Sequence, residues 1–190
     1  MGRKKHHSRT SILEAAVELV DLQGKEHFAV RNLAKHIGAS TQPIYSYFPD
    51  FKSLYDAVLE EIGKLHMAYI NKPYSEYVFR NMGFGFTLFA KDHPNLFQAF
   101  FDDHDRNRTF IEGFLKGLRI ALDNDERFDL MSSRGKDVLL DKMWTFCYGY
   151  ASLIIKKLVL EDSDEQIKDR ILETGRAIIL DTLKREGIID

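Results

Sequence analysis

Apolar residues recur at helical spacing along almost the whole chain. The first clear set of apolar residues with this spacing lies on one helix face and consists of Ile12, Ala15, Ala16, Leu19 and Val20. Ser11 and Glu14 have the spacing of a capping box at the start of this helix, and Gly24 suits its end. Because no strand-like alternation and no internal repeat interrupts this pattern, the sequence predicts an all-α fold of about nine helices.

The remaining helices are delimited by residues that cap or break helices. The predicted boundaries are a turn at Gly38, breaks at Pro49, Pro73 and Pro94, caps at Asp50 and Ser163–Gln166, and the ends of a long helix over about 133–160. A short helix is expected from about Thr41 to Phe48, and a longer one follows Asp50.

The stretch from Arg31 to Leu54 has the pattern of a helix-turn-helix. Gly38 lies at the tight turn Gly38-Ala39-Ser40, where glycine permits a positive φ. The inward-facing residues are Leu33, Ala34 and Ile37 on the first helix and Ile44 and Phe48 on the second. The second helix presents short or hydrogen-bonding groups on its outer face, as a helix that enters the major groove does: Thr41, Gln42, Tyr45 and Ser46.

The first turn of this second helix suits an anionic partner. Pro43 is well placed there, because the N–H that proline lacks has no partner within the helix. Ser40 or Thr41 can cap the turn, and the partial positive charge of a helix N-terminus favours a phosphate.

The motif resembles that of the TetR-like (tetracycline-repressor family) transcriptional regulators over roughly residues 10–60. The matching residues are Leu33-Ala34, Gly38-Ala39-Ser40, Ile44-Tyr45-Ser46-Tyr47-Phe48, Lys52 and Leu54. The resemblance implies a DNA-binding domain over 1–52, with the helix 50–71 as connector. It also implies an effector-binding and dimerisation domain over 53–190.

The resemblance assigns the DNA contacts to a small set of residues. The resemblance implies that Arg31 contacts a base edge or a phosphate and that Thr41, Gln42 and Pro43 contact base edges. It implies phosphate contacts for Tyr45 and Tyr47 and a DNA-backbone contact for Lys52, and it includes Ser40, at the start of the helix, among the DNA-binding residues. Residue chemistry agrees, since glutamine pairs with adenine and tyrosine hydroxyls donate to phosphate oxygens. The alternative is that the two tyrosines pack inward and that the lysine is merely solvated.

Position 30 departs from the family pattern. Family members usually carry a threonine there as helix cap and phosphate contact, and Val30 can serve as neither. The basic residues Arg3, Lys4, Lys5 and Arg9 could compensate by reaching the DNA backbone or the minor groove.

Charge divides the chain into two parts. The net charge of −2 argues against a protein that wraps nucleic acid with its whole surface. However, the first 52 residues hold eight Lys/Arg and five Asp/Glu, and so have a net positive charge. The remaining residues hold 19 Lys/Arg and 24 Asp/Glu, and so have a net negative charge. This division fits a DNA-reading head on an acidic body.

Eleven of the fourteen phenylalanines lie between Phe79 and Phe146. Most must form core, but together they could also line an apolar cavity, and the resemblance implies a small effector there. The candidate ligand-binding residues are Phe86, Phe89, Phe97, Phe101, Phe110, Trp144 and Tyr148. The expected ligand is hydrophobic or aromatic.

The last two long helices suit dimerisation. Ile171 and Ile178 supply apolar surface, and Gly175 and Ala177 allow close approach, so four helices could form a two-fold bundle. Two recognition helices must reach successive major grooves about 34–36 Å apart. A dimer meets this requirement.

The predicted function is that of a homodimeric transcriptional regulator, most simply a repressor that leaves a palindromic operator when an effector binds. Two alternatives remain: a helical ligand-binding or protein-interaction module with weakened DNA binding, and an α-helical enzyme. The enzyme has the least support, because the sequence has no H-E-x-x-H, nucleophile elbow, P-loop or dinucleotide-binding turn.

No cofactor, metal or membrane partner is expected. Asp102-Asp103-His104-Asp105 fits a solvated connection better than a metal loop, and Cys147 fits a buried thiol. One cysteine forms no intrachain disulfide, and no apolar run approaches the roughly 18 residues that span a bilayer. The expected location is the cytoplasm.

Overall fold

The computed structural model describes residues 7–102, 104–160 and 163–190, with the backbone alone of 104–107. Arg3, Lys4 and Lys5 of the predicted basic tail, and Asp103 of the loop weighed as a metal site, lie outside the described residues.

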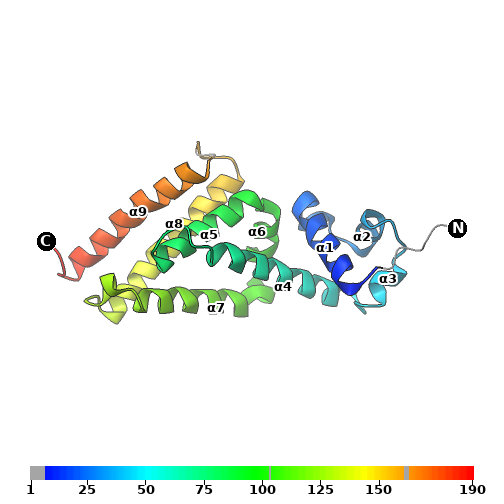
Figure 1. The fold of residues 1–190 in the computed structure, drawn as a ribbon, viewed down its shortest axis with the longest axis horizontal. Coiled ribbons are helices and arrows are strands. Elements are labelled where there is room, and N and C mark those ends of the chain that lie inside the picture. The colour runs from blue at the N-terminus through cyan, green and yellow to red at the C-terminus, as the bar shows by residue number, and fades with distance from the viewer. Residues whose placement is uncertain (1–6, 103, 161–162) are drawn as a thin grey trace. The chain divides into compact units, whose positions relative to one another are not determined.

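The described residues form nine α-helices and two short 3-10 helices, without a strand (Figure 1). In chain order these are α1 (Arg9–Gln23), η1 (Lys25–His27), α2 (Val30–His36), α3 (Gln42–Tyr45), α4 (Phe51–Ile70), α5 (Val78–Asp92), α6 (Pro94–Phe101), α7 (His104–Asp123), η2 (Glu126–Phe128), α8 (Ser133–Ile155) and α9 (Asp164–Arg185). The predicted all-α fold is confirmed. None of these helices is long and apolar enough to cross a membrane.

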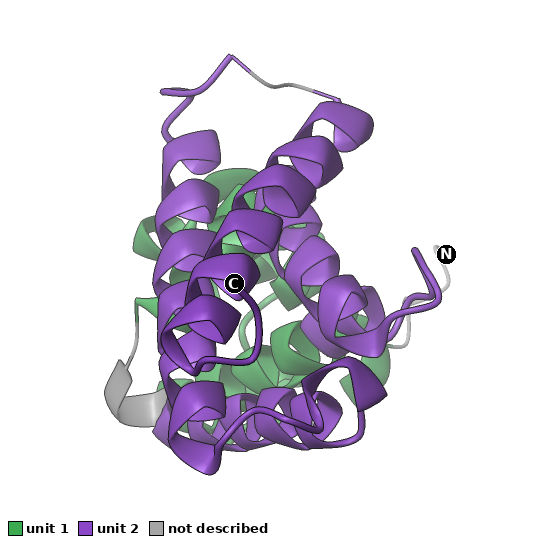
Figure 2. Cartoon of the chain, turned by 90° about the vertical axis from the view of Figure 1, so that its left-hand side faces the viewer, with its two compact units in different colours: residues 1–65, 93–107 green, residues 66–92, 108–190 purple. Residues whose placement is uncertain are grey.

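The helices group into two compact units (Figure 2). Unit 1 comprises residues 1–65 and 93–107, and unit 2 comprises 66–92 and 108–190. The sequence placed the domain boundary at residue 52, whereas packing divides α4 after Leu65 and adds α6 to unit 1. The assignment of separate functions to the two parts stays a prediction.

Polar contacts explain why α6 belongs to unit 1. The ring Nδ1 of His93, which precedes α6, lies 2.8 Å from a carboxylate oxygen of Asp21 at the end of α1. The side-chain amide of Asn95 donates to the backbone carbonyl of Asp21 at 2.7 Å. A short helix that begins 71 residues after the end of α1 is thereby fixed against α1.

Several predicted helix ends are confirmed, and one capping box is not. Asp50 accepts a hydrogen bond from the backbone N–H of Ser53 at 2.7 Å, and Ser163 with Gln166 forms the predicted box at α9. The box predicted at Ser11 and Glu14 is wrong, because Ser8 caps α1 and Ser11 is its partner three residues on. The helix therefore begins earlier than its apolar stripe indicates.

The long helix α8 ends at Ile155, five residues before the predicted end. Lys157 adopts a left-handed conformation with φ of 55°. The N–H of Leu158 donates to the carbonyl of Leu153 at 2.9 Å, which closes the helix in the manner usual for glycine. A lysine at this position gives no sequence signal for a helix end.

Candidate nucleic-acid interface

Helices α2 and α3 of unit 1 form the predicted helix-turn-helix. Gly38 has the positive φ of 67° that the turn requires. The backbone N–H of Gly38 donates to the carbonyl of Lys35 at 3.2 Å, and the N–H of Ala39 donates to the carbonyl of Ala34 at 2.9 Å. These two carbonyls near the end of α2 therefore have hydrogen-bond partners. The turn is thus fixed by backbone hydrogen bonds around one glycine.

The inward face of the motif is buried as predicted, except that Ile37 is half-buried. Leu33 and Ile44 are fully buried, and Phe48 and Ala34 are nearly so. The guanidinium carbon of Arg9 lies 5.0 Å above the Phe48 ring, which holds this member of the basic segment against unit 1. These contacts fix which side of α3 faces outward.

The outward face carries the predicted DNA-contact residues. Gln42 and Ser40 are exposed, and Thr41 and Pro43 are half-buried. Pro43 occupies the first turn of α3 as predicted. Neither Ser40 nor Thr41 caps α3 through its side chain, so that part of the prediction is wrong. In the part of the chain that the structure describes, both hydroxyls have no hydrogen-bond partner, which leaves them available to an external acceptor.

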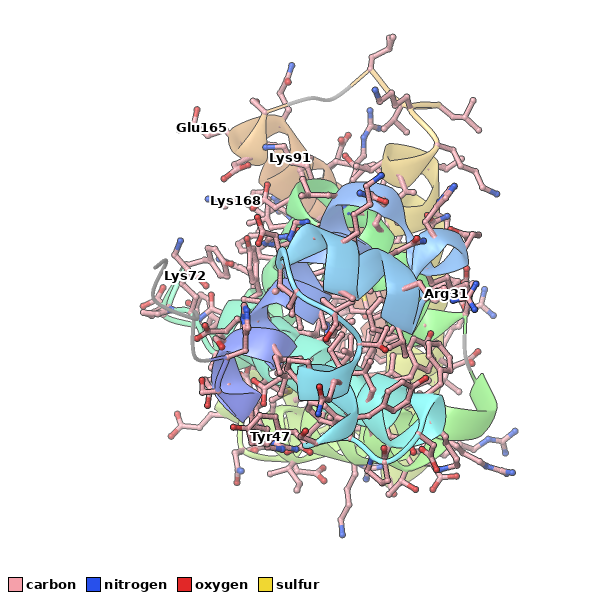
Figure 3. All side chains as sticks on the ribbon, turned by 90° about the vertical axis from the view of Figure 1, so that its right-hand side faces the viewer. Arg31, Tyr47, Lys72, Lys91, Glu165 and Lys168 are labelled. Atoms are coloured by element: carbon pink, nitrogen blue, oxygen red, sulfur yellow. The ribbon has the colours of Figure 1, made fainter. Side chains whose placement is uncertain are left out.

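The two tyrosines point outward rather than into the core. Tyr45 is 49% exposed and Tyr47 is 39% exposed, whereas their neighbour Ile44 is buried. Figure 3 labels Tyr47 and Arg31, both on unit 1. The exposure of the tyrosines favours the contact role over the packing alternative.

Lys52 lies in the first turn of α4, with its side chain 72% exposed. Its ammonium group is 2.6 Å from a carboxylate oxygen of Asp56, one helical turn on. An exposed ion pair of this kind contributes only about 0–1 kcal/mol, so a phosphate could replace the carboxylate. The hydrogen bond from Ser53 to Asp50 lowers the pKa of Asp50, which keeps this cap ionised beside Lys52.

The start of α2 is the weakest part of the interface. Arg31 is exposed, as a DNA contact requires. Val30 is buried and Ala29 is the N-cap, so no side chain caps this helix. The expected loss of a capping and phosphate-contacting hydroxyl agrees with this geometry.

In unit 2, five of the seven predicted ligand-binding residues belong to one ring cluster. The ring of His66 lies 5.7 Å from Phe86, 5.1 Å from Phe89 and 6.0 Å from Phe110. Trp144 lies 5.2 Å from Phe86 and 5.8 Å from Tyr148, and Phe114 completes the cluster at 5.3 Å from His66. The sequence did not point to His66 or Phe114.

The other two predicted ligand-binding residues are Phe97 and Phe101. They lie on α6 in unit 1, with ring centroids 4.5 Å apart, and both are buried. The periodicity of α6 contains no signal that this helix joins the N-terminal unit, so its rings cannot be told from those of unit 2 by sequence alone.

The ring cluster is packed closely. The cavity beside it, lined by Phe86, Phe114, Trp144 and neighbouring apolar residues, measures about 30 Å³. This volume is about that of one water molecule. An apolar ligand could enter only if rings separate.

The predicted dimer residues are largely covered within unit 2. Ile171 is 3% exposed, and Gly175 is buried with the Met143 methyl carbon 3.3 Å from where a Cβ would lie. Ile178 is half-buried. The exposed stripe on α8 is Val138, Asp141, Thr145, Gly149 and Leu153.

Among the described residues, no group of three or more His, Cys, Asp or Glu side chains is placed to hold a metal ion. Cys147 is buried, and this burial raises the pKa of its thiol to about 12.

Comparison with known proteins agrees with the motif. Residues 12–58 match the family model of bacterial regulatory proteins, tetR family. A 76-residue stretch is 30% identical to the nucleoid occlusion factor SlmA of Vibrio cholerae, and the match spans 40% of this chain and 39% of that protein.

Two solved structures share the fold over most of the chain. A tetR-family transcriptional regulator from Streptomyces coelicolor has a TM-score of 0.73 at 13% identity, covering 99% of this chain and 87% of the other. A protein from Rhodococcus sp. assigned to the same family has a TM-score of 0.68 at 17% identity, and the match covers 90% of this chain and 97% of the other.

Proposed function

We propose that this TetR-like DNA-binding transcriptional regulator is a repressor that binds a palindromic operator as a homodimer and leaves it when a small effector binds unit 2. The observation that carries the proposal is the division of the helix-turn-helix into a buried side, with Ile44 and Phe48, and an outward side, with Gln42, Tyr45 and Tyr47. A regulator that acts on the bacterial chromosome works in the cytoplasm, where we place this protein.

Each outward residue has a role that its chemistry allows. Gln42 reads an adenine in the major groove through its side-chain amide, and Thr41 and Pro43 contact a thymine methyl group. Tyr45, Tyr47 and Lys52 contact phosphates, and so position the helix without reading sequence. The hydroxyls of Ser40 and Thr41 are further donors to phosphate.

The test is a titration of the purified protein against the DNA upstream of its own gene at 50 and 200 mM salt. Specific binding is expected to weaken by about 10³-fold or more between these concentrations, because phosphate contacts release counterions. If no specific binding occurs at either concentration, the protein fits the alternative of a ligand-binding or protein-interaction module, which the uncapped start of α2 favours.

Two variants separate base reading from backbone contact in the same titration. Lys52→Ala is expected to weaken binding to all sequences about equally and to reduce the salt slope by about 2, because the homodimer loses two phosphate contacts. Gln42→Ala is expected to change the preference among operator variants by about 1–3 kcal/mol at one position. Lys64→Ala is the control for the lysine, because Lys64 lies on the same helix and is also ion-paired. Equal effects of Lys52→Ala and Gln42→Ala would contradict the assigned roles.

We place the dimer interface on the exposed stripe of α8 and the adjoining flank of α9, which carries Thr174 and Ala177. Apart from its chain neighbours and the backbone of its own helical turn, no described atom lies within 4 Å of a Cβ at Gly149, so a partner helix can approach closely there. A two-fold axis brings equivalent residues of the two subunits together. The proposed interface leaves out the predicted residues Ile171, Gly175 and Ile178, since Ile171 and Gly175 are buried within unit 2 and Ile178 is half-buried.

This dimer is tested by sedimentation at micromolar concentration. The protein is expected to be a dimer, and Thr145→Glu is expected to produce monomers, because two like charges would meet near the axis. Thr109→Glu is the control, since Thr109 is exposed on α7 away from the stripe. A monomeric parent protein, or a dimer that tolerates Thr145→Glu, would argue against this interface.

The effector acts by binding one arrangement of the dimer better than the other. A hydrophobic or aromatic molecule that parts the rings beside Trp144 would stabilise a form of unit 2 that the closed cluster excludes. If the two recognition helices then no longer match successive major grooves, the operator is released.

A further inference from the structure

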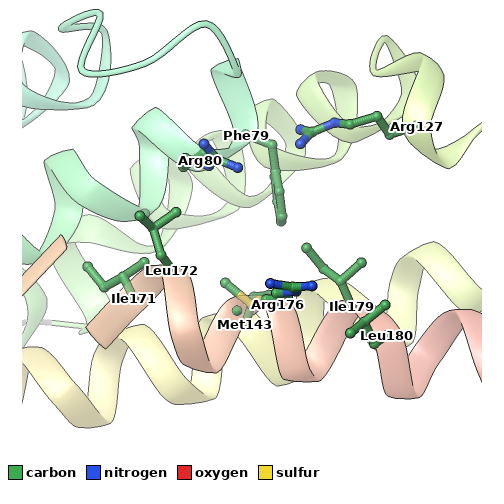
Figure 4. Close-up of a pocket in the computed structure, with 11 residues that line it drawn as sticks. Phe79, Arg80, Arg127, Met143, Ile171, Leu172, Arg176, Ile179 and Leu180 are labelled. Atoms are coloured by element: carbon green, nitrogen blue, oxygen red, sulfur yellow. The ribbon is translucent and has the colours of Figure 1, made fainter. Parts of the chain in front are cut away.

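Unit 2 has a second concavity that is far larger than the cavity in the ring cluster. It is a groove of about 460 Å³ between α5 and α9, with Met143 of α8 and Arg127 of η2 also lining it (Figure 4). A volume of 300–1,000 Å³ is typical of sites for small molecules. The groove is thus large enough for a ligand without rearrangement.

The groove combines an apolar wall with three cations. Its apolar side chains are Phe79, Met143, Ile171, Leu172, Ile179 and Leu180. Arg80, Arg127 and Arg176 border the same space, and none of the described residues that line it is acidic (Figure 4). Guanidinium groups bind carboxylate and phosphate through paired hydrogen bonds. The lining therefore favours an anion with an apolar tail.

Two of the arginines converge on one aromatic ring. The guanidinium carbon of Arg127 lies 3.6 Å from the centroid of the Tyr77 ring, and that of Arg80 lies 4.6 Å from the same centroid. Arg127 is also ion-paired with Asp125. The ring and the carboxylate hold Arg127 in place, while two like charges remain close together.

The nearby acids do not neutralise the groove. Asp125 is engaged mainly by Arg127 and interacts more weakly with Arg80, and the exposed Glu76 contributes only a weak interaction to Arg127. Arg80 and Arg176 form no ion pair within the part of the chain that the structure describes. A bound anion would offset these two charges.

We propose that the groove binds an anionic amphiphile, with its carboxylate or phosphate head group between Arg80 and Arg176 and its apolar tail along Phe79, Met143 and Ile179. The proposal names a chemical class for the effector. Binding of the anion does not depend on the proposed function, but release of the operator upon binding does. Phe79, Gly83 and Met143 line both the groove and the small ring-cluster cavity, so a ligand in the groove adjoins the aromatic rings. The groove uses Leu172, Arg176 and Leu180, which lie on the flank of α9 opposite the proposed dimer interface.

The test is calorimetric titration of the full chain, without DNA, with four probes that share a ten-carbon chain and differ in head group. Decanoate and decyl phosphate carry an anion, decan-1-ol is neutral, and decyltrimethylammonium is cationic. At least one anionic probe is expected to bind at least about tenfold more tightly than decan-1-ol, because charged hydrogen bonds to arginine are lost in the alcohol. The tighter anion identifies the preferred head group. Equal affinity for the neutral or cationic probe would overturn the proposal.

Variants locate the binding site. Arg80→Gln and Arg176→Gln are each expected to weaken binding of the anionic probe about tenfold. Arg185→Gln is the matched control, because this arginine lies on α9, is 73% exposed and does not line the groove. Circular dichroism verifies that each variant is folded. Full affinity in the double variant Arg80→Gln/Arg176→Gln would show that the anion binds elsewhere.

Failure of this inference is distinguishable from failure of the proposed function. A protein that binds its operator but no anionic probe remains a regulator with a different effector. A protein that binds the anion but no operator retains the groove site and loses the regulatory role.

Discussion

Replacing Gly85 with alanine is expected to lower the free energy of unfolding by about 3 kcal/mol, because the added methyl group would overlap the backbone of α4. A Cβ at position 85 would lie 2.3 Å from the carbonyl oxygen of Tyr69 and 2.7 Å from the backbone nitrogen of Ile70. Backbone atoms within a helix cannot turn aside as a flexible side chain can. The substitution therefore forces α4 and α5 apart.

The measurement is urea unfolding followed by the fluorescence of Trp144. This is the one tryptophan of the chain, and it lies in the same unit as Gly85. The expected loss corresponds to a fall in Tm of about 6–12 °C for a domain of 150–250 residues.

Gly113→Ala is the matched control for this substitution. Gly113 also lies within a helix, α7, but no atom is within 4 Å of where its Cβ would be. Alanine there should raise stability by up to about 1 kcal/mol, because it restricts the unfolded chain more than glycine does. If both variants shift stability alike, α4 and α5 do not approach as closely in solution as they do here.

The local features of the fold were largely predictable from the sequence. Apolar spacing located the helices, and proline or a serine–glutamine pair located several of their ends, such as Pro94 and Ser163–Gln166. Where a helix end depends on an uncommon conformation of an ordinary residue, as at Lys157, the sequence had no signal to offer. The same limit explains the misplaced cap at Ser11, since Ser8 precedes the apolar stripe that located the helix.

The helix-turn-helix was predictable because all its parts are close together in the sequence. Gly38 forms the turn, and Ile44 and Phe48, which follow within about a dozen residues, are the buried side chains of the second helix. The outward positions then follow from helical geometry. The side-chain cap expected from Ser40 or Thr41 was wrong, because the N-cap residue Thr41 has helical backbone angles, and a capping residue is typically extended.

Features that depend on tertiary packing were not predictable. Arg80, Arg127 and Arg176 belong to three separate elements and share no sequence pattern, so only the packing of α9 beside α5 reveals their groove. Ile171 and Gly175 have the composition of a helix interface, and they do form one, but with α5 and α8 of the same chain. Apolar periodicity shows that a face is buried without showing what covers it.

His66 gives unit 2 a specific sensitivity to acid. Its side chain is fully buried within the ring cluster, and this burial lowers the pKa of the imidazole from 6.5 to about 3. Above pH 6.5 the imidazole is neutral in both the folded and the unfolded chain. As the pH falls from 6.5 toward 3, the unfolded chain gains a proton that the folded chain does not bind, so stability is lost over that range.

We expect the wild-type protein to lose about 2 kcal/mol of stability between pH 7.5 and pH 5 through this residue alone, because each pH unit below 6.5 is worth about 1.4 kcal/mol. His66→Leu removes the titrating group and keeps the site apolar, so this part of the loss should disappear in the variant. Urea unfolding of both proteins at the two pH values, followed by Trp144 fluorescence, measures the difference. His27→Gln, which changes an exposed histidine of unit 1, should leave the wild-type pH dependence intact. Parallel losses in wild type and His66→Leu would mean that the imidazole is accessible to protons in the folded chain, and that the ring cluster is open to water rather than closed.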